Sequence, residues 1–177
     1  MDWKDQQVSV QLSSDSYDTQ VENAGSSTYY GFEVELREKL ADGWTLYQNL
    51  GHTRTRFDEF TTSVDDYAGH EFPRSPRWTA SIGAAYEHKS GWFGTGSFSY
   101  VGNSYTTADN YPDFRLRART LLNAKLGYRT SRWLACLYGT NLLDDEYFES
   151  LWDEAPGLFS GTPSAPRVIG IGLESRF

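Results

Sequence analysis

The sequence predicts an all-β, antiparallel up-and-down barrel that crosses a membrane, and three observations point to this fold. Apolar and polar residues alternate along eight segments of the chain, and the connections between these segments are alternately long and short. Aromatic residues make up 16% of the 177 residues and gather beside the short connections. Because successive side chains of a strand point to opposite faces, each alternating segment has one apolar face and one polar face.

The eight segments differ in how clearly they alternate. In the clearest one, Trp78, Ile82 and Tyr86 fall on one face, while Ser81 and Glu87 fall on the other. The other clear segments are residues 30–36, 121–129 and 169–177. A weaker one begins at Val8. Three more are extended without showing which face is apolar, roughly residues 44–56, 92–102 and 133–142.

The connections predict which ends of the strands lie together. Three are tight turns, at residues 41–43, 89–91 and 130–132, and two of these end in the glycine that tight hairpins favour. The remaining four are long, at residues 13–27, 57–76, 103–118 and 143–165. Loops of more than about 12–15 residues are uncommon in compact domains. Since alternate connections of an up-and-down sheet lie at the same end, we expect all the long loops at one rim.

Composition and charge exclude several classes of protein. No run approaches the roughly 18 apolar residues of a membrane-spanning helix, and the mean hydropathy is −0.60. The net charge of −8 argues against a nucleic-acid partner, because such proteins carry basic surfaces. A single cysteine, Cys136, excludes disulfide scaffolds and cysteine-based zinc sites.

Alternation alone does not say whether the apolar face meets lipid or a dry protein interior. Short turns at one end and long loops at the other are typical of outer-membrane barrels. Aromatic rings beside the turns, such as Trp44, Trp92 and Trp133, suit a membrane–water interface. A closed barrel is also the sheet form that can span a bilayer. We therefore favour a lipid bilayer as the partner. The alternatives are a self-contained small eight-stranded outer-membrane barrel and a soluble, lipocalin-like ligand-binding barrel.

Several stretches of the chain resemble sequence patterns of TonB-dependent outer-membrane receptors. Residues 138–147, Tyr-Gly-Thr-Asn-Leu-Leu-Asp-Asp-Glu-Tyr, are similar to the family's N-L-x-D-x-x-Y signature. The stretch from Pro163 through Arg167 to Phe177 resembles its last strand, with a Pro-Arg entry and a terminal aromatic residue. Residues 31–36 and 73–78 also match recurrent patterns, so the resemblance covers essentially the whole chain.

This resemblance implies both an architecture and a function. Family members have a 22-stranded barrel, an N-terminal plug and a segment that contacts TonB. Residues 1–177 would then be the C-terminal segment, the last third of such a barrel, with the plug domain absent; the missing signal peptide would follow from truncation. The implied function is TonB-dependent uptake of a scarce chelate in the outer membrane of a Gram-negative bacterium, and the expected chelate is a ferric siderophore. The TonB complex would act through the missing N-terminal part.

The same resemblance suggests where the chain binds its ligand and its assembly partner. Long-loop aromatic and arginine residues would suit an anionic, ring-bearing iron chelate: Tyr105, Tyr111, Arg115, Arg117 and Trp152. The alternative interpretation makes them ordinary rim aromatics and salt-bridged arginines. A C-terminal aromatic residue, here Phe177, would act as the recognition signal for the outer-membrane assembly machinery.

The sequence predicts no enzyme, no cofactor and no metal site. The three histidines lie in different segments without ligand spacing, and no G-x-S-x-G motif is present. The acidic run from Asp144 to Glu146 lacks the spaced oxygen ligands of a calcium loop, so we interpret it as a solvated turn at the rim. Cys136 in the middle of a predicted strand is interpreted as a small packed hydrophobic residue.

Overall fold

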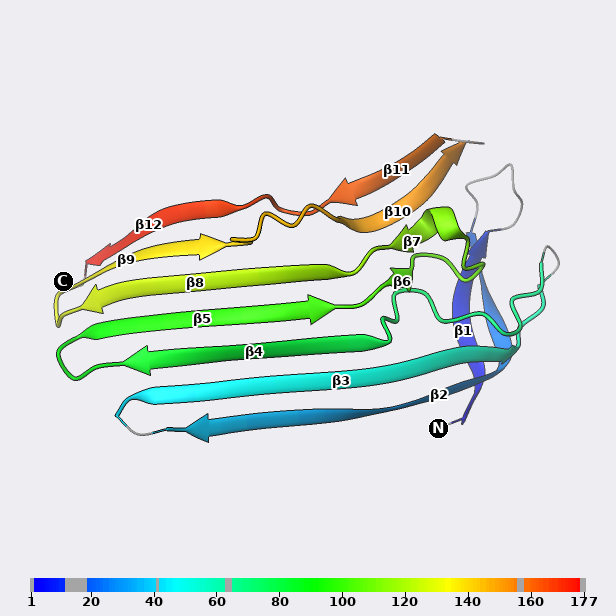
Figure 1. Ribbon diagram of the computed structural model, residues 1–177. Helices are drawn as coiled ribbons and strands as arrows, with labels where there is room; N and C mark the ends of the chain where they lie inside the picture. Colours follow the sequence, from blue (N-terminus) through cyan, green and yellow to red (C-terminus); the bar gives the residue numbers. More distant parts are fainter. Residues whose placement is uncertain (1, 12–18, 41, 63–64, 156–157, 176–177) are drawn as a thin grey trace.

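The computed structural model describes the chain except for residues 1, 12–18, 41, 63–64, 156–157 and 176–177 (Figure 1). Within the described part, eight strands form one sheet in which each strand pairs antiparallel with the next. In order across the sheet they are β1 (Asp2–Gln11), β2 (Thr19–Lys39), β3 (Trp44–Glu59), β4 (Trp78–Glu87), β5 (Trp92–Val101), β8 (Arg119–Arg129), β9 (Trp133–Thr140) and β12 (Val168–Ser175). The predicted all-β, antiparallel up-and-down fold is confirmed.

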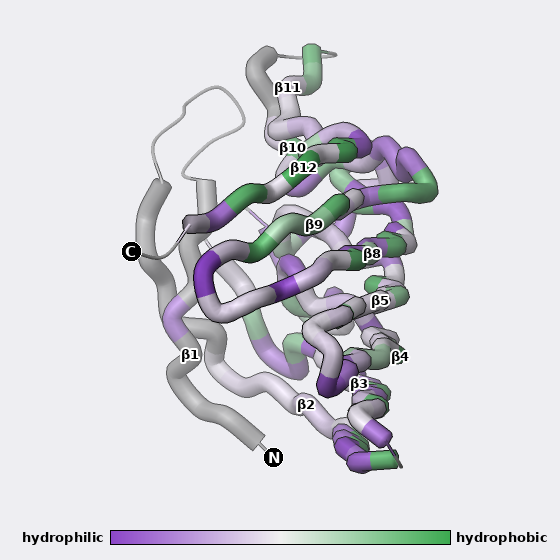
Figure 2. Tube along the Cα trace, turned by 90° about the vertical axis from the view of Figure 1, so that its left-hand side faces the viewer, coloured by the Kyte–Doolittle hydropathy of each residue, from purple (hydrophilic) through white to green (hydrophobic). Residues whose placement is uncertain are grey.

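The sheet is curved. Figure 2 shows the curvature in a view along the strands, from the end with the tight turns. Its edge strands β1 and β12 do not pair with each other among the described residues, so the sheet is an open part of a barrel. It does not form the closed eight-stranded barrel of the first alternative. A search of the described residues for a helix with the length and hydropathy of a membrane span found none.

The long connections lie at one end of the sheet, as predicted, and two of them contain small hairpins of their own (Figure 1). In the connection from β5 to β8, β6 (Ser104–Tyr105) pairs with β7 (Arg115–Leu116), and the short 3₁₀ helix η1 (Pro112–Phe114) lies between them. In the connection from β9 to β12, β10 (Phe148–Ala155) pairs with β11 (Leu158–Pro163).

One predicted loop is wrong. Residues 13–27 were expected to form a long connection, but β2 already begins at Thr19 and pairs with β1 from Thr19 to Thr28. At 21 residues, β2 is about twice the length that a tilted strand needs to cross a bilayer, about 9–11 residues. In a barrel that crosses a bilayer, its first half, together with β1, would therefore extend beyond the membrane on the side of the long loops.

The tight turns have the backbone conformations that their sequences suggest. Asp42 and Gly43 both have positive φ, 55° and 87°, and the N–H of Glu87 donates to the Gly43 carbonyl. Gly91 has φ 103°, a value that only glycine adopts readily, and its carbonyl accepts from the N–H of Arg129. These backbone bonds connect neighbouring turns and fix the strand register at this end.

The strand register places most of the large apolar side chains on the outer, convex face. One layer of cross-strand partners runs through Leu36, Gln48, Ile82, Phe98 and Leu122. Outward side chains such as Ile82, Ile171 and Leu173 are 48%, 75% and 80% exposed, whereas the inward Phe93 and Cys136 are both buried. The apolar face therefore does not line a dry centre, and the lipocalin-like alternative is wrong.

The register also settles the facing of the three strands whose alternation was unclear. Trp44 on β3, Trp92 on β5 and Leu137 on β9 point outward with the apolar residues of their neighbours. Their pattern is weak because small or polar residues interrupt the outer face, such as Gln48 on β3 and Gly96 on β5. Cys136, on the opposite face to Leu137, is buried as predicted.

Aromatic rings form two rows on the outer face. Beside the turns, the ring centroids of Trp44 and Tyr86 are 4.7 Å apart, and Tyr128 lies 5.2 Å from Trp92 and 5.7 Å from Trp133. The second row consists of Phe32, His52 and Trp78. Trp78 lies eight residues before Tyr86 on β4. At about 3.3 Å per residue and a tilt of about 40°, the two rows are about 20 Å apart in height. This separation suits the two interfaces of a bilayer.

On the inner face, aromatic rings lie flat over glycines of the adjacent strand. A Cβ on Gly83 would be 2.3 Å from the ring of Tyr47, and one on Gly127 would be 2.4 Å from the ring of Phe93. Both glycines sit directly opposite those aromatic residues in the register. Glycine is thus required for close ring packing against the inner wall. Arg129 and Lys125 lie 4.9 and 5.8 Å from the centre of the Phe93 ring.

Candidate ligand-recognition surface

The loop after β3 packs onto the loop after β5 through a small hydrophobic core. The fully buried Phe57 and Phe60 have ring centroids 4.9 Å apart, and Tyr67 lies 5.1 Å from Phe60. Ala108, from the second loop, is buried in the same cluster. Burial raises the pKa of the Tyr67 hydroxyl above its usual value, and the nearby Asp65 carboxylate raises it further. These contacts fix two of the long loops against each other.

Polar contacts join the same two loops and also reach a third long loop, the connection from β9 to β12. The Asn110 side chain bonds the backbone of Glu71 twice: its Oδ1 accepts from the Glu71 N–H at 2.7 Å, and its Nδ2 donates to the Glu71 carbonyl at 3.0 Å. Arg77 forms an ion pair with the Glu71 side chain. From the first loop, Arg74 Nη2 donates to Ser150 Oγ on β10 at 3.1 Å.

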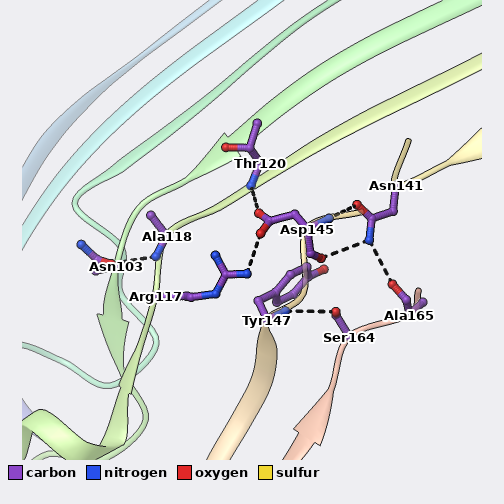
Figure 3. A network of polar contacts seen from close by, with 9 residues as sticks. All are labelled: Asn103, Arg117, Ala118, Thr120, Asn141, Asp145, Tyr147, Ser164 and Ala165. Atoms are coloured by element: carbon purple, nitrogen blue, oxygen red, sulfur yellow. Dashed lines mark hydrogen bonds and ion pairs between the residues drawn. The ribbon is translucent and has the colours of Figure 1, made fainter. Parts of the chain in front are cut away.

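A network around Asn141 and Asp145 anchors the third loop to the rim of the sheet (Figure 3). The Asn141 Oδ1 accepts from the Asp145 N–H at 3.0 Å, and its Nδ2 donates to the carbonyls of Asp145 and Ala165 at 3.1 and 3.2 Å. The backbone N–H of Asn141 donates to Asn123 Oδ1 on β8. Asn141 has φ 48°, a conformation that asparagine tolerates better than most residues.

The Asp145 carboxylate completes this network by bridging two segments (Figure 3). Its Oδ2 accepts from the Thr120 N–H at 2.7 Å, and its Oδ1 accepts from Arg117 Nη2 at 2.5 Å. The Thr120 hydrogen bond, more than the Arg117 ion pair, lowers the pKa of this carboxyl below its usual value. The acidic run thus serves as a structural clamp at the rim, in which Asp144 also pairs with Arg167 at 3.2 Å.

We expect this clamp to weaken in acid. A carboxyl whose pKa is lowered in the folded state stabilises the folded loop at pH values above its unfolded pKa of about 3.9. This stabilisation is lost as the pH falls through the lowered pKa of the folded state. Limited proteolysis of the loop from Asn141 to Arg167 should therefore accelerate below about pH 4. Cleavage that is as slow at pH 3 as at pH 6 would contradict the assigned role of Asp145.

Beside the clamp, the base of the β10–β11 hairpin and β7 enclose a pocket of about 490 Å³. Its walls combine apolar and aromatic side chains and one serine with three charged side chains. They are Leu116, Tyr147, Phe148, Leu151, Pro163, Ser164 and Pro166, together with Arg115, Arg117 and Glu146. Arg119 lies 5.1 Å above the Tyr147 ring. The pocket thus offers positive charge beside aromatic and aliphatic surface.

The sequence-predicted binding residues are only partly brought together. Arg115 and Arg117 both line the pocket, and Tyr105 is the register partner of Arg115. Tyr111 is exposed before η1, away from the pocket lining. Trp152 follows the lining residue Leu151 on β10, so its side chain leaves the strand on the opposite face. Phe177 lies outside the described residues.

The two arginines of the pocket are not equivalent. Arg117 is held by Asp145, as the alternative interpretation of salt-bridged rim arginines predicts. Arg115 is exposed and forms no ion pair with any residue in the described part of the chain. Arg115 is therefore the pocket arginine whose charge is not paired within the described part of the chain. Sequence reasoning did not nominate Tyr147 or Phe148 as binding residues, although Tyr147 is the tyrosine of the N-L-x-D-x-x-Y match.

Among the described residues, no three His, Cys, Asp or Glu side chains are grouped as ligands for a metal ion. His52, His70 and His88 also have separate partners. His70 Nδ1 lies 2.9 Å from the Ala108 carbonyl, His88 Nδ1 lies 2.6 Å from Ser90 Oγ, and His52 stacks on Phe32.

Comparison with known proteins gives a consistent result. The family described as TonB dependent receptor-like, beta-barrel matches residues 1–142. The pesticin receptor of Yersinia pestis is 30% identical over 129 residues, which make up 71% of this chain and 18% of the receptor. The chain thus spans less than a fifth of the length of this curated relative.

Solved structures resemble the chain over most of its length. The ferric yersiniabactin uptake receptor FyuA from Yersinia pestis superposes with a TM-score of 0.75 at 25% identity, covering 87% of this chain and 24% of the receptor. The copper transporter OprC gives a TM-score of 0.74 at 16% identity, over 99% of this chain and 28% of the transporter. The siderophore receptor PiuA from Acinetobacter baumannii gives 0.71 at 18% identity, over 88% and 22%. The last two likenesses concern the fold.

Proposed function

This chain belongs to the TonB dependent receptor-like β-barrel family, and we propose that it forms the C-terminal part of a receptor barrel that takes up a ferric siderophore. The family is one of outer-membrane receptors and transporters, not of enzymes. The relative FyuA is a receptor for ferric yersiniabactin uptake, which supports an iron chelate as the substrate class here. The location would be the outer membrane of a Gram-negative bacterium.

The pocket beside β7 is the observation that carries the proposal. An iron chelate that is anionic and bears rings needs a cation for its charge and flat apolar surface for its rings. Arg115 provides a cation that forms no ion pair among the described residues, and Tyr147 and Phe148 provide the aromatic surface. Tyr105, beside Arg115, extends this surface, whereas Tyr111 and Trp152 would contribute only through the outer parts of the loops.

A plug domain and a TonB-contacting segment would be supplied by residues outside this chain, and TonB would act through them. The eight strands would be about a third of the complete barrel. Under this proposal these residues bind the chelate at the rim and form part of the channel wall, but do not transport alone. Phe177, the final residue, would direct recognition by the outer-membrane assembly machinery.

Replacing Arg115 with glutamine in the complete receptor tests the proposal. Loss of one charge-assisted contact should weaken binding by about tenfold or more, since such contacts contribute a net stabilisation of roughly 1.5–3 kcal/mol and about 1.4 kcal/mol corresponds to a factor of ten. The measurement is uptake of ⁵⁵Fe-labelled ferric yersiniabactin, ferric citrate and a ferric catecholate by iron-starved cells that lack other receptors. We expect a higher apparent KM for the chelate that the wild type transports, with little change in maximal rate.

Arg132→Gln is the matched control, because Arg132 is an exposed arginine in a tight turn at the opposite rim. This variant should transport like the wild type. Deleting TonB should abolish uptake in all three proteins. Uptake that persists without TonB, or that none of the chelates supports, would overturn the proposed function. Equal transport by Arg115→Gln and wild type would remove the pocket from it.

A further inference from the structure

The outer face of β3 carries two arginines directly above the second aromatic row. His52, Arg54 and Arg56 follow one another at every second position, so all three point outward. Arg54 and Arg56 are exposed, and they face Tyr30 and Thr28 of β2 in the register. Because they lie on the outer face, these side chains do not contribute to the recognition pocket beside β7.

The second aromatic row forms a compact shelf below the arginines. The ring centroids of His52 and Phe32 are 5.7 Å apart with nearly parallel planes, and Trp78 lies 4.3 Å from His52 and 6.0 Å from Phe32. Phe32 and Trp78 remain 51% and 44% exposed. Rings of this kind mark the boundary between hydrocarbon and headgroups.

The height of the arginines matches the headgroup region. Arg54 is ten residues beyond Trp44, which belongs to the row beside the turns. At about 3.3 Å per residue and a tilt of about 40°, this corresponds to about 25 Å of height, which equals the apolar band of an outer-membrane barrel. Arg56 lies about 5 Å higher. Both guanidinium groups therefore reach the level of lipid phosphates, beyond the hydrocarbon.

The charges near the two arginines differ. Arg54 forms no ion pair with any residue that the structure describes. Arg56 lies 3.7 Å from the Asp58 carboxylate, whose other oxygen accepts from Thr28 Oγ1 at 2.6 Å. Asp58 thus orients Arg56, while the Arg56 side chain is still 65% exposed. The net charge of the chain is −8, so the overall charge does not explain why two arginines lie together on the outer face.

We propose that Arg54 and Arg56, above the Phe32–His52–Trp78 shelf, bind the phosphate of a lipid headgroup in the membrane leaflet on the long-loop side. Guanidinium groups bind phosphate through paired, charge-assisted hydrogen bonds. The aromatic shelf supports the apolar part of the same lipid just below the phosphate. The site would orient the barrel at the membrane surface independently of the transported chelate.

Native mass spectrometry of the complete receptor in detergent tests this site. The probes are lipid A carrying two phosphates, lipid A carrying one phosphate, and phosphatidylethanolamine, each added separately. The test variant is Arg54→Gln/Arg56→Gln, and the control is Lys89→Gln/Arg132→Gln, which removes two exposed charges from the opposite rim. Arg54→Lys/Arg56→Lys retains the charge and checks that the strand still folds.

We expect the test variant to lose roughly fivefold of its affinity for phosphorylated lipid A per arginine, the loss being larger with two phosphates than with one. The control should stay within about twofold of the wild type for every lipid. The lysine variant, which keeps the charge but not the paired hydrogen bonds, should lose less affinity than the glutamine variant. All these differences should shrink at high salt. Unchanged binding by the test variant, or an equal loss in the control, would overturn the proposal. Ferric chelate uptake should be unaffected, which separates this proposal from the proposed transport function.

Discussion

Replacing Ile82 with arginine is expected to destabilise the membrane-inserted barrel by about 2–4 kcal/mol. Ile82 points outward from β4, midway between Trp78 and Tyr86, and its side chain is 48% exposed. In a bilayer this exposed surface contacts hydrocarbon near the midplane, where a guanidinium is poorly solvated. Urea unfolding of the complete receptor in vesicles, followed by tryptophan fluorescence, measures the change in free energy.

The matched control is Ser81→Arg, one residue earlier on the same strand. Ser81 points to the inner face, where its register partners are Asn49 and Ser99. An arginine there meets a polar wall, so we expect a cost below about 1 kcal/mol. If the two substitutions cost the same, or if Ser81→Arg cost more, the outer face of this sheet would not be the lipid-facing one.

Much of the barrel architecture could be predicted because lipid imposes a simple rule on it. Every outward residue between the two aromatic rows meets hydrocarbon, and the resulting period of two is visible in the sequence around Ile82. The same rule explains the wrong prediction for residues 13–27. The paired region from Thr19 to Thr28 extends beyond the membrane, where neither face needs to be apolar, so its sequence reads as a polar loop.

The recognition surface was less predictable than the sheet. Arg115 and Arg117 could be nominated from their charge and their position in a long loop, but their different roles depend on Asp145, 28 residues beyond Arg117. Tyr147 and Phe148 come to the pocket because the β10–β11 hairpin folds back toward β7. Contacts between loops carry no periodicity, so only the folded chain reveals which loop residues meet.

Asp145→Asn is expected to loosen the loop that carries the pocket, by about 2–4 kcal/mol. The substitution keeps the size of the side chain but removes the charge shared by two hydrogen bonds, from the Thr120 N–H and from Arg117. Asparagine has only one acceptor oxygen, so one of the two bonds becomes a neutral bond of about half the strength. The other bond is lost, because the asparagine Nδ2 is itself a donor. Because loops can open without unfolding the barrel, the suitable measurements are amide exchange at Thr120 and proteolysis between Asn141 and Arg167.

Asp144→Asn provides the matched control, since it removes the same charge from the adjacent residue. Asp144 pairs with Arg167 at the surface, where both side chains are more than 40% exposed, so its loss should cost less than about 1 kcal/mol. Asparagine also tolerates the positive φ of 56° at this position. Opening that is equally fast in both variants would mean that general loss of negative charge loosens the loop. Faster opening in Asp145→Asn alone, together with weaker chelate binding, would show that the Asp145 clamp holds the pocket wall in place.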